Sequence, residues 1–414
     1  MTSHILSPLT KGLDVLSPEG GLEGGAARAV ENVVLLDDGR IRRRPLQAPL
    51  FSIAGAHSLW RSAAQTRAFV AAQDVLYELD VAASAVSALY VGLPVDQPVE
   101  YADVGPDVYA TAGGTLLKIT PAGQVRRPGV ANLIGVKPTL TATAGSLPAG
   151  RYGVAYSLIN DLGDESSVSS AAFLELTAAG GIMLSGITDA ANVARMRVYL
   201  TTANGADLYP HSSASRASTT SITDARKDGD VATRTGKQPM PGGEIVRLFN
   251  GRLYVADRKR IWVSDPLDYG LSDVVGGWIT FDRTITMLEP VSSGLFVGLR
   301  ERVIFLRGND PSDFRYEDAD RRGAFAHSGM QASPEYFSPA LAKDRDRPVA
   351  VWLSEGGMAV GRNDGSVVHP QESRIAVSGG ISRPAFFTFE GVGQGVFSVE
   401  EMSLGDGGAS DLVT

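Results

Sequence analysis

The chain of 414 residues contains no cysteine. This absence excludes a disulfide framework, a thiolate zinc site and a cysteine nucleophile, so packing and hydrogen bonding must hold the fold together. Long apolar runs are missing as well, because no stretch approaches the roughly 18 consecutive apolar residues that a membrane-spanning helix needs. The N-terminus shows no basic region followed by an apolar stretch and a cleavage site. We therefore expect a soluble protein that is made in a cytoplasm and has no membrane partner.

Positive charge is in short supply. The 38 Lys and Arg residues are outnumbered by 46 Asp and Glu residues, which gives a net charge of −8. A protein that binds nucleic acid through an extended basic face needs clustered cations that neutralise phosphates. The sequence also has no G-x-x-x-x-G-K-[ST] phosphate loop and no G-x-S-x-G nucleophile elbow. These absences argue against an extended nucleic-acid interface and against nucleotide chemistry.

The composition that is present is typical of β structure. Hydrophobic residues make up 43% of the chain and charged residues 20%, which is enough for a sizeable core. The 47 glycines and 22 prolines favour many short strands joined by tight turns. Helix signals are scarce, and the best of them predicts one or two turns at Ala26, Ala27, Ala29 and Val30, before Asn32.

Six segments have the pattern of a β-hairpin, in which two runs of alternating apolar residues flank a short polar or glycine turn. They span 67–80, 107–121, 250–266, 293–311, 347–365 and 384–400. Most successive hairpins start about 37 to 53 residues apart, near the period of four-stranded propeller blades. The second and third hairpins start 143 residues apart, and removing a block of about 100 residues restores the period.

The block that interrupts the series has a character of its own. Short alternating strands follow one another at the spacing of a seven-strand sandwich, and a polar return linker rich in Gly and Pro ends the block. We predict an all-β fold, a β-propeller of five or six blades with an inserted immunoglobulin-like or fibronectin-like β-sandwich. Residues 1–136 would form an N-terminal arm and the first blades, 137–238 the sandwich, and 239–414 the remaining blades.

The N-terminal segment at 11–50 has a distinctive order of features. A turn of small residues leads to Asn32 and a strand, and the turn Asp37-Asp38-Gly39 is followed by an arginine-rich strand. Asp-Gly is a strong hairpin signal. With the segment GAHSLW at 55–60 and the propeller-like hairpins, this order resembles the tail hub or nozzle proteins of short-tailed bacteriophages. Within the block, 147–166 and 197–211 resemble the sandwich domain that such proteins carry.

The resemblance implies a function and a set of partners. Members of this family are virion structural proteins of the phage tail, and usually about six copies form a ring below the head-to-tail adaptor. The lumen of the ring conducts DNA during ejection without sequence-specific binding. The implied partners are further copies of the chain, the adaptor, other tail proteins and the passing DNA. The implied localisation is the virion, after synthesis in a host cytoplasm.

Two groups of charged residues are candidate interface or channel contacts. Arg40, Arg42 and Arg44 share one face of an alternating strand, which is tolerable only where carboxylates or phosphates face them. They would either pair with acidic residues of this or a neighbouring chain, or face DNA or the adaptor. Asp257, Arg258, Lys259 and Arg260 form the exposed tip of the hairpin at 250–266, where the propeller resumes after the insert, and would touch a neighbouring subunit or the channel.

No catalytic residue, cofactor or metal site is predicted, and we expect no enzymatic activity. The histidines, His4, His57, His211, His327 and His369, have no further ligand at H-x-x-x-H spacing. Clustered carboxylates, as at 161–165 and 344–346, lie in apparent turns, where Asp and Asn commonly bond their own backbone. The segment at 160–166 has oxygen-rich residues that suit calcium but lacks the EF-hand spacing.

The alternative to a structural role is a carbohydrate-binding or carbohydrate-cleaving propeller of a receptor-binding tail component. Two carboxylates from different blades would have to lie about 5 to 10 Å apart across a cleft. Aromatic residues within or beside the hairpins would line a sugar groove, although aromatics in blades more often fill the space between blades. They are Trp60, Tyr77, Tyr109, Trp262, Phe305, Trp352 and Phe397.

Overall fold

The computed structural model describes residues 50–64, 66–337 and 346–372 without interruption, together with 12–14, 16–18, 21–28, 33–35, 40–43, 375–378, 384–389, 392–397 and 401–402. Its regular elements are β-strands and short 3₁₀ helices, among them η2 (Pro311–Asp313) and η3 (Pro334–Tyr336). The described residues contain no α-helix, and hence none that could span a membrane. The predicted all-β class is confirmed.

The body of the described chain consists of sheets built from consecutive antiparallel strands, which we call blades one to five. Blade one contains β5 (Ala56–Arg61), β6 (Ala68–Ala72), β7 (Val75–Asp80) and β8 (Ala85–Val91). Blade two contains β9 (Glu100–Val104), β10 (Asp107–Ala112), β11 (Thr115–Ile119) and β12 (Val125–Arg126). Blade three contains β20 (Lys237–Pro239), β21 (Ile245–Phe249), β22 (Arg252–Asp257), β23 (Arg260–Asp265), β24 (Asp268–Asp273) and β25 (Trp278–Thr280).

The remaining strands continue the series. Blade four contains β26 (Ile285–Val291), β27 (Gly294–Leu299), β28 (Val303–Arg307) and β29 (Arg315–Asp320). Blade five contains β30 (Met330–Ala332), β31 (Val349–Ser354), β32 (Gly357–Gly361) and β33 (Val367–Val368). A further hairpin joins β35 (Pro384–Phe389) to β36 (Val392–Phe397), and β34 (Val377–Ser378) pairs with β37 (Glu401–Met402). This succession of blades makes the fold a β-propeller, with five such sheets among the described residues, and the total of five or six blades stays a prediction.

All six predicted hairpins are present. Those of blades one to five form the two middle strands of each sheet, for example β22 and β23. Turn chemistry explains one of the connections: Asn250 and Gly251 adopt φ of 45° and 74° between β21 and β22, and residues at a tight two-residue turn need such positive values.

Aromatic side chains fill the space between neighbouring blades, as predicted. Trp60 of blade one stacks on Tyr101 of blade two, with ring centroids 5.2 Å apart. Phe296 of blade four lies 5.4 Å from Trp352 of blade five. Both Phe296 and Trp352 are fully buried, and such contacts add to the stabilisation that burial itself provides. These rings therefore fix the packing between blades and do not line a groove.

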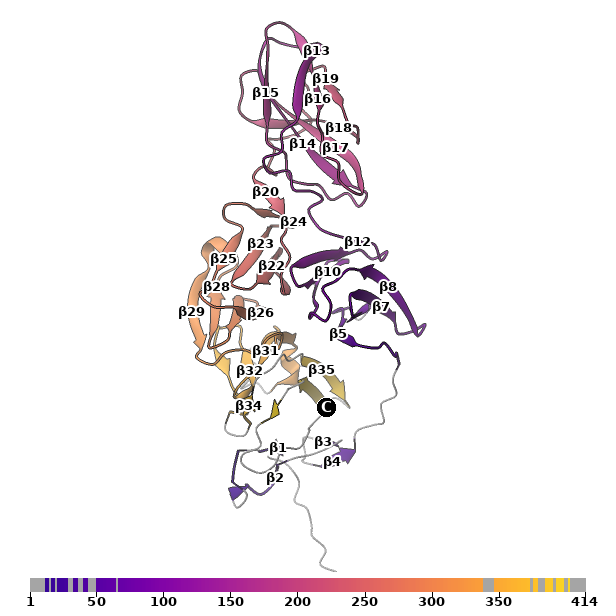
Figure 1. Ribbon diagram of the computed structural model, residues 1–414. Coiled ribbons are helices and arrows are strands. Elements are labelled where there is room, and N and C mark those ends of the chain that lie inside the picture. Colours follow the sequence, from indigo (N-terminus) through magenta and orange to yellow (C-terminus); the bar gives the residue numbers. More distant parts are fainter. Residues whose placement is uncertain are drawn as a thin grey trace, which may run out of the picture.

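Between blades two and three the chain leaves the propeller and forms an insert of two sheets (Figure 1). One sheet has the order β13 (Thr139–Leu147), β16 (Gly180–Ser185) and β19 (Thr220–Ile222). The other has the order β15 (Ala172–Leu176), β14 (Gly150–Asn160), β17 (Val193–Thr201) and β18 (Leu208–Ser215). Buried residues from both sheets, such as Leu184 and Val198, share one core. The insert thus consists of two sheets that share one core, and its assignment as an immunoglobulin-like or fibronectin-like sandwich stays a prediction.

The N-terminal segment contains short strands and no helix where it is described. β1 (Gly12–Leu13) pairs in parallel with β2 (Ala26–Ala27), and β3 (Val33–Leu35) pairs with β4 (Ile41–Arg43). The helical turns predicted at Ala26 and Ala27 are therefore wrong: pairing with β1 outweighs the helix propensity of alanine. Figure 1 places β1 to β4 at the end of the molecule opposite the insert.

Candidate functional site at the junction of the insert and the propeller

The chain leaves and re-enters the propeller at one place. Gly129 follows β12 with φ of +83°, and a Cβ atom at this position would lie 2.7 Å from the Cα atom of Pro239 in β20. Only glycine permits this close approach of the two backbones in this conformation. After the insert, the chain returns to the propeller at Lys237, the first residue of β20, and β20 pairs with β24 of blade three. The two connections of the insert are therefore adjacent.

One turn of the insert is tied to blade two by ion pairs. Asn160 shapes the turn, because its side-chain oxygen accepts hydrogen bonds from the backbone N–H groups of Leu162 and Asp164. Lys118 Nζ on β11 lies 2.7 Å from Asp164 Oδ1. Arg126 Nη2 at the end of β12 lies 3.1 Å from Asp161 Oδ2. The carboxylates predicted to lie in a turn thus also hold the insert against the propeller.

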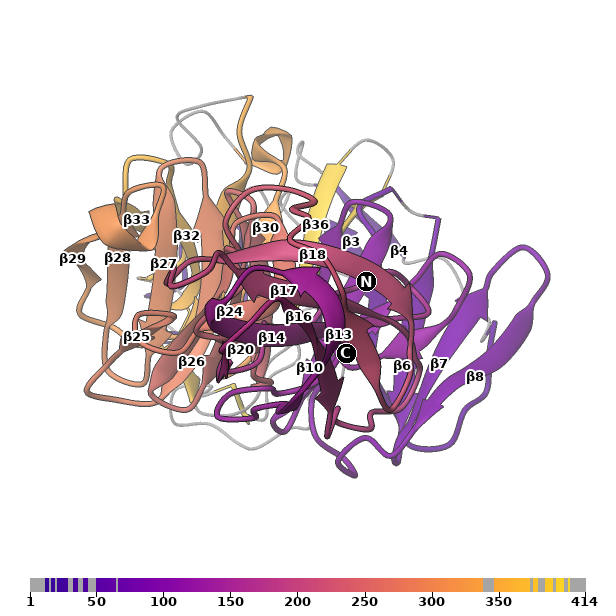
Figure 2. The same ribbon diagram turned by 90° about the horizontal axis from the view of Figure 1, so that it is seen from above.

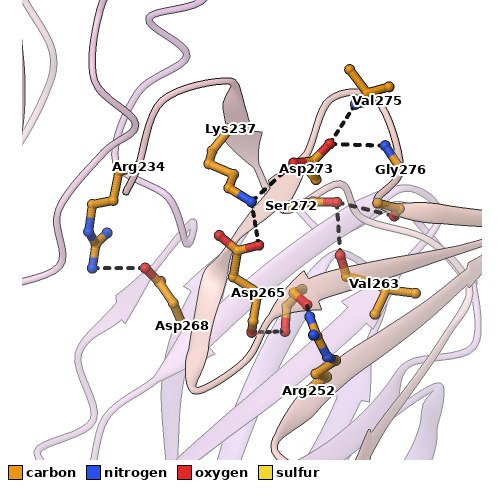
Figure 3. Close-up of polar contacts among 12 residues, drawn as sticks. Arg234, Lys237, Arg252, Val263, Asp265, Asp268, Ser272, Asp273, Val275 and Gly276 are labelled. Atoms are coloured by element: carbon orange, nitrogen blue, oxygen red, sulfur yellow. Dashed lines mark hydrogen bonds and ion pairs between the residues drawn. The ribbon is translucent and has the colours of Figure 1, made fainter. Parts of the chain in front are cut away.

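The return segment carries a second set of ion pairs. Arg234 Nη2 lies 2.8 Å from Asp268 Oδ2, and Arg234 Nη1 donates to the backbone oxygen of Glu165 at 2.9 Å. Lys237 Nζ lies 2.9 Å from Asp265 Oδ1 and 3.1 Å from Asp273 Oδ2. Figure 3 shows Arg234 reaching Asp268, and Lys237 lying between the two other carboxylates. The insert, its return segment and blade three are therefore linked electrostatically.

An open pocket of about 410 Å³, which we call the junction pocket, lies beside these contacts. It lies where the turn between β9 and β10, the exit of the chain after β12, the ion-paired turn of the insert and the turn between β23 and β24 meet. Its polar side chains are Asp107, Tyr109, Lys118, Asp164, Glu165, Arg234, Asp268 and Tyr269. A pocket with convergent polar groups between two domains is a typical location for a binding site.

The junction pocket is electronegative. Burial raises the pKa of the Tyr109 hydroxyl above its usual value, and Asp164, Asp107 and Asp268 raise it further through their charges. Burial also raises the pKa of the Asp268 carboxyl, and the charges of Asp265 and Asp164 add to this against the opposing effect of Arg234. Burial would lower the pKa of Lys118, but the hydrogen bond and charge of Asp164, with a smaller contribution from Asp107, raise it overall.

The predicted hairpin tip lies at the end of blade three away from this pocket, because β23 runs from Arg260 at the tip to Asp265 at the junction. Arg258, Lys259 and Arg260 are exposed, as expected for a tip. The tip backbone is anchored, since the N–H groups of Ile285 and Phe281 donate to the carbonyl oxygens of Arg258 and Lys259 at 2.7 and 2.8 Å. Asp257 Oδ1 lies 3.7 Å from Arg258 Nε. The tip and the junction pocket are separate sites.

The predicted arginine face is described in part. Arg40 and Arg42 are exposed at the hairpin of β3 and β4, and each has an interaction partner within the structure. Arg44 lies outside the described residues. Since these strands lie at the end opposite the insert (Figure 1), the arginines belong to neither the hairpin tip nor the junction pocket.

A buried charged cluster joins four blades at the innermost strands. Arg247 Nη1 on β21 lies 2.9 Å from Glu100 Oε2 on β9, and Arg247 Nε donates to Glu289 Oε1 on β26 at 2.8 Å. His327, just before β30, lies with Nδ1 3.0 Å from Glu100 Oε1. Burial raises the pKa of the Glu289 carboxyl more than Arg247 lowers it. This cluster is largely buried and links the four blades.

A serine, a histidine and an aspartate also meet between blades four and five. His369 Nε2 lies 2.6 Å from Asp320 Oδ2, and His369 Nδ1 lies 3.5 Å from Ser354 Oγ. Nucleophilic catalysis needs a serine hydroxyl that a substrate can reach. Ser354 is fully buried and donates its hydroxyl proton to the backbone oxygen of Gly357 at 3.1 Å. The trio therefore joins the two blades and offers no accessible nucleophile.

Reasoning from spacing missed the histidine and carboxylate pairs, because their members are far apart along the chain. His327 and Glu100 are 227 residues apart, and His369 and Asp320 are 49 residues apart. Local motifs carry no signal for such contacts. Within the described part of the chain, no group of three His, Cys, Asp or Glu residues is placed to hold a metal ion.

No family model and no curated protein sequence matches the chain. Among solved structures, it is similar to the WD40 domain of Neurospora crassa Pan2, with 10% identity, coverage of 80% of this chain and 85% of that chain, and a TM-score of 0.30. It is also similar to BBS1N in complex with ARL6DN, with 11% identity, 77% and 79% coverage and a TM-score of 0.25. A third similar structure is the AfRom2 CNH domain, with 5% identity, 74% and 94% coverage and a TM-score of 0.19.

Proposed function

We propose that this chain is a structural protein of a short-tailed bacteriophage tail. Further copies of the chain would join it head to tail in a ring below the head-to-tail adaptor, and DNA would pass through the lumen of the ring. The sequence order at 11–50 and 55–60 supplies the resemblance on which this setting rests. The observation that supports ring assembly is the outer edge of blade one, which pairs with no other described strand.

Exposed apolar side chains gather around this edge. On β8, Val86 and Val91 are 40% and 65% exposed. In the adjoining loops, Val81 and Val95 are 51% and 60% exposed. Monomeric soluble proteins rarely leave large apolar patches uncovered unless the patch takes part in binding. The concentration of such residues in one blade therefore supports a protein contact there.

The backbone of β8 supports the same conclusion. Within the described residues β8 pairs only with β7, so its other side presents unpaired backbone groups along seven residues. Its sequence, AVSALYV, contains no charged residue. Proteins usually protect an edge strand with charges or keep it very short, since a long apolar edge pairs with other chains. The outer strand of blade four, β29, has that protection in Arg315, Glu317 and Asp318.

A second copy of this chain is the occupant that fits best. Figure 2 places β8 and β29 at opposite ends of the molecule. A contact between β8 and the far end of the next copy would join two different surfaces, and such head-to-tail contacts form rings when the rotation closes. The net charge of −8 suits a conduit, because fixed cations would hold the DNA phosphates.

The proposal is tested by placing a charge on the edge. Val86→Lys together with Val91→Lys puts two ammonium groups on β8, and we expect about a tenfold or greater loss of ring assembly and of incorporation into phage particles, with a folded monomer. The measurements are sedimentation velocity and the copy number per purified particle. Val275→Lys is the matched control, since Val275 is 84% exposed in another blade.

Two outcomes would contradict the proposal. One is a wild-type chain that never enters purified particles. The other is a double variant that assembles as well as Val275→Lys does. A monodisperse monomer that cleaves polysaccharide would favour the carbohydrate-active alternative.

A further inference from the structure

The junction pocket contains one polar group that the protein leaves without a partner. Tyr109 is 97% buried, with 3% of its surface exposed, and its hydroxyl makes no hydrogen bond to any described residue. The ring packs edge to face against Tyr269, with centroids 6.2 Å apart, so its position is fixed. Tyr109 lines the pocket, so a ligand there can reach this hydroxyl. A ligand in the pocket would supply the missing partner.

The charges around this hydroxyl determine which charge a ligand in the pocket can carry. Asp107, Asp164 and Asp268 line the pocket, against the cations Lys118 and Arg234. The carboxylate of Glu165 is satisfied inside the insert by Arg197 Nη1 at 2.9 Å and by the Tyr199 hydroxyl at 2.8 Å. One negative charge is therefore in excess among these side chains. An anion would be repelled, and a neutral polyol would leave the charge unbalanced.

The pocket already accommodates one ammonium group. Lys118 Nζ lies 2.7 Å from Asp164 Oδ1 and 3.4 Å from Asp107 Oδ2. Arg234 occupies one oxygen of Asp268, and a carboxylate has room for about four hydrogen bonds in all. Asp268 also accepts a hydrogen bond from the backbone of Gly270 and still has room for more, so the acceptors that stay available include Asp268 and the Tyr109 oxygen. An ammonium group is a compact cation with three N–H donors, which matches this arrangement.

We propose that the junction pocket binds a small aliphatic amine, whose ammonium group donates to Tyr109 and to Asp268 while its alkyl chain lies along Tyr269 and Leu267. Leu267 lies in the turn before β24 and Tyr269 lies on β24, and both line the pocket. Leu267 is 78% exposed, so an alkyl chain gains apolar contact there. Such a ligand touches blade two and blade three beside the connections of the insert. This site does not depend on ring assembly.

Binding of n-butylamine, with 1-butanol as the neutral analogue of the same length, tests the proposal. Titration of the full chain followed by calorimetry and ligand-observed NMR should show saturable binding of n-butylammonium and at least tenfold weaker binding of 1-butanol. Tyr109→Phe keeps the ring and removes the acceptor, so we expect a loss of about tenfold or more in affinity. Asp268→Asn, which removes the charge, should lower the affinity further.

Controls separate a specific site from a general attraction of amines to an acidic protein. Tyr316→Phe and Asp282→Asn make the same chemical changes at exposed positions of the propeller, and both variants should bind as the wild type does. The proposal is overturned if 1-butanol binds as well as n-butylamine, if neither binds, or if Tyr109→Phe binds as tightly as Tyr316→Phe. Saturable binding of glucose, used as a further probe, would indicate a saccharide site and would also overturn the proposal.

Discussion

At the scale of single residues, the side chain of Arg247 links several blades. Its guanidinium contacts Glu100 and Glu289, and Arg247 Nη2 also donates to the backbone oxygen of Gly329 at 3.3 Å. These partners belong to different blades or, for Gly329, to the approach to blade five. Burial alone would lower the pKa of Arg247, but Glu289 and Glu100 raise it well above its usual value. The buried carboxylates and Arg247 therefore stabilise the fold only when all of them are present.

Removing Arg247 alone should be strongly destabilising. Arg247→Met leaves Glu289 buried and unpaired, and breaking a buried pair on one side costs about 3–5 kcal/mol. Urea unfolding followed by tryptophan fluorescence measures this loss, since all 4 tryptophans, Trp60, Trp262, Trp278 and Trp352, lie in the blades. Arg258→Met at the exposed tip is the control and should change the free energy of unfolding by less than about 0.5 kcal/mol. Equal effects of the two variants would contradict the assigned role.

At the scale of elements, the predicted hairpins and the missed strands have different physical origins. The middle strands of a blade are covered on both faces, so β22 and β27 are almost wholly buried and carry a strong apolar pattern. Most outer strands, such as β12 and β29, are short or polar, and their sequences resemble loops, with the apolar β8 as an exception. The apolar pattern therefore predicts the two middle strands of each blade and not its outer strands. The junction pocket was not predictable, because its residues converge only when blades two and three and the insert pack together.

The tip between β22 and β23 is predicted to act through its side chains. Arg258→Glu with Lys259→Glu should weaken ring assembly without unfolding the monomer, because the carbonyl groups that anchor the tip are retained whatever the side chains are. Sedimentation velocity measures assembly, and tryptophan fluorescence checks the fold. Arg300→Glu with Arg302→Glu, at another exposed turn, makes the same change of four in net charge and serves as the control. If the tip variant unfolds, or if it assembles as the control does, the tip is not an interface.

At the scale of the whole molecule, the adjacency of Gly129 and Pro239 makes the insert a separable unit. The insert has its own two-sheet core, and the polar contacts that tie it to the propeller include ion pairs such as that of Arg126 with Asp161. Exposed ion pairs of this kind contribute roughly 0–1 kcal/mol each. Blade three resumes with β20 at Lys237, so the excision that preserves the propeller ends just before that residue. The propeller core clusters contain no residue of the insert sheets.

Replacing residues 130–235 with a short Gly-Ser linker should therefore leave a folded propeller. The ends are already in contact, so closing the gap costs little chain entropy, and the tryptophan transition in urea should stay cooperative with a loss of no more than about 3 kcal/mol. The isolated segment 130–235 is the matched control, and its circular dichroism should show a cooperative β-sheet transition of its own. A gradual fluorescence change in the shortened chain would mean that blades two and three need the insert to pack.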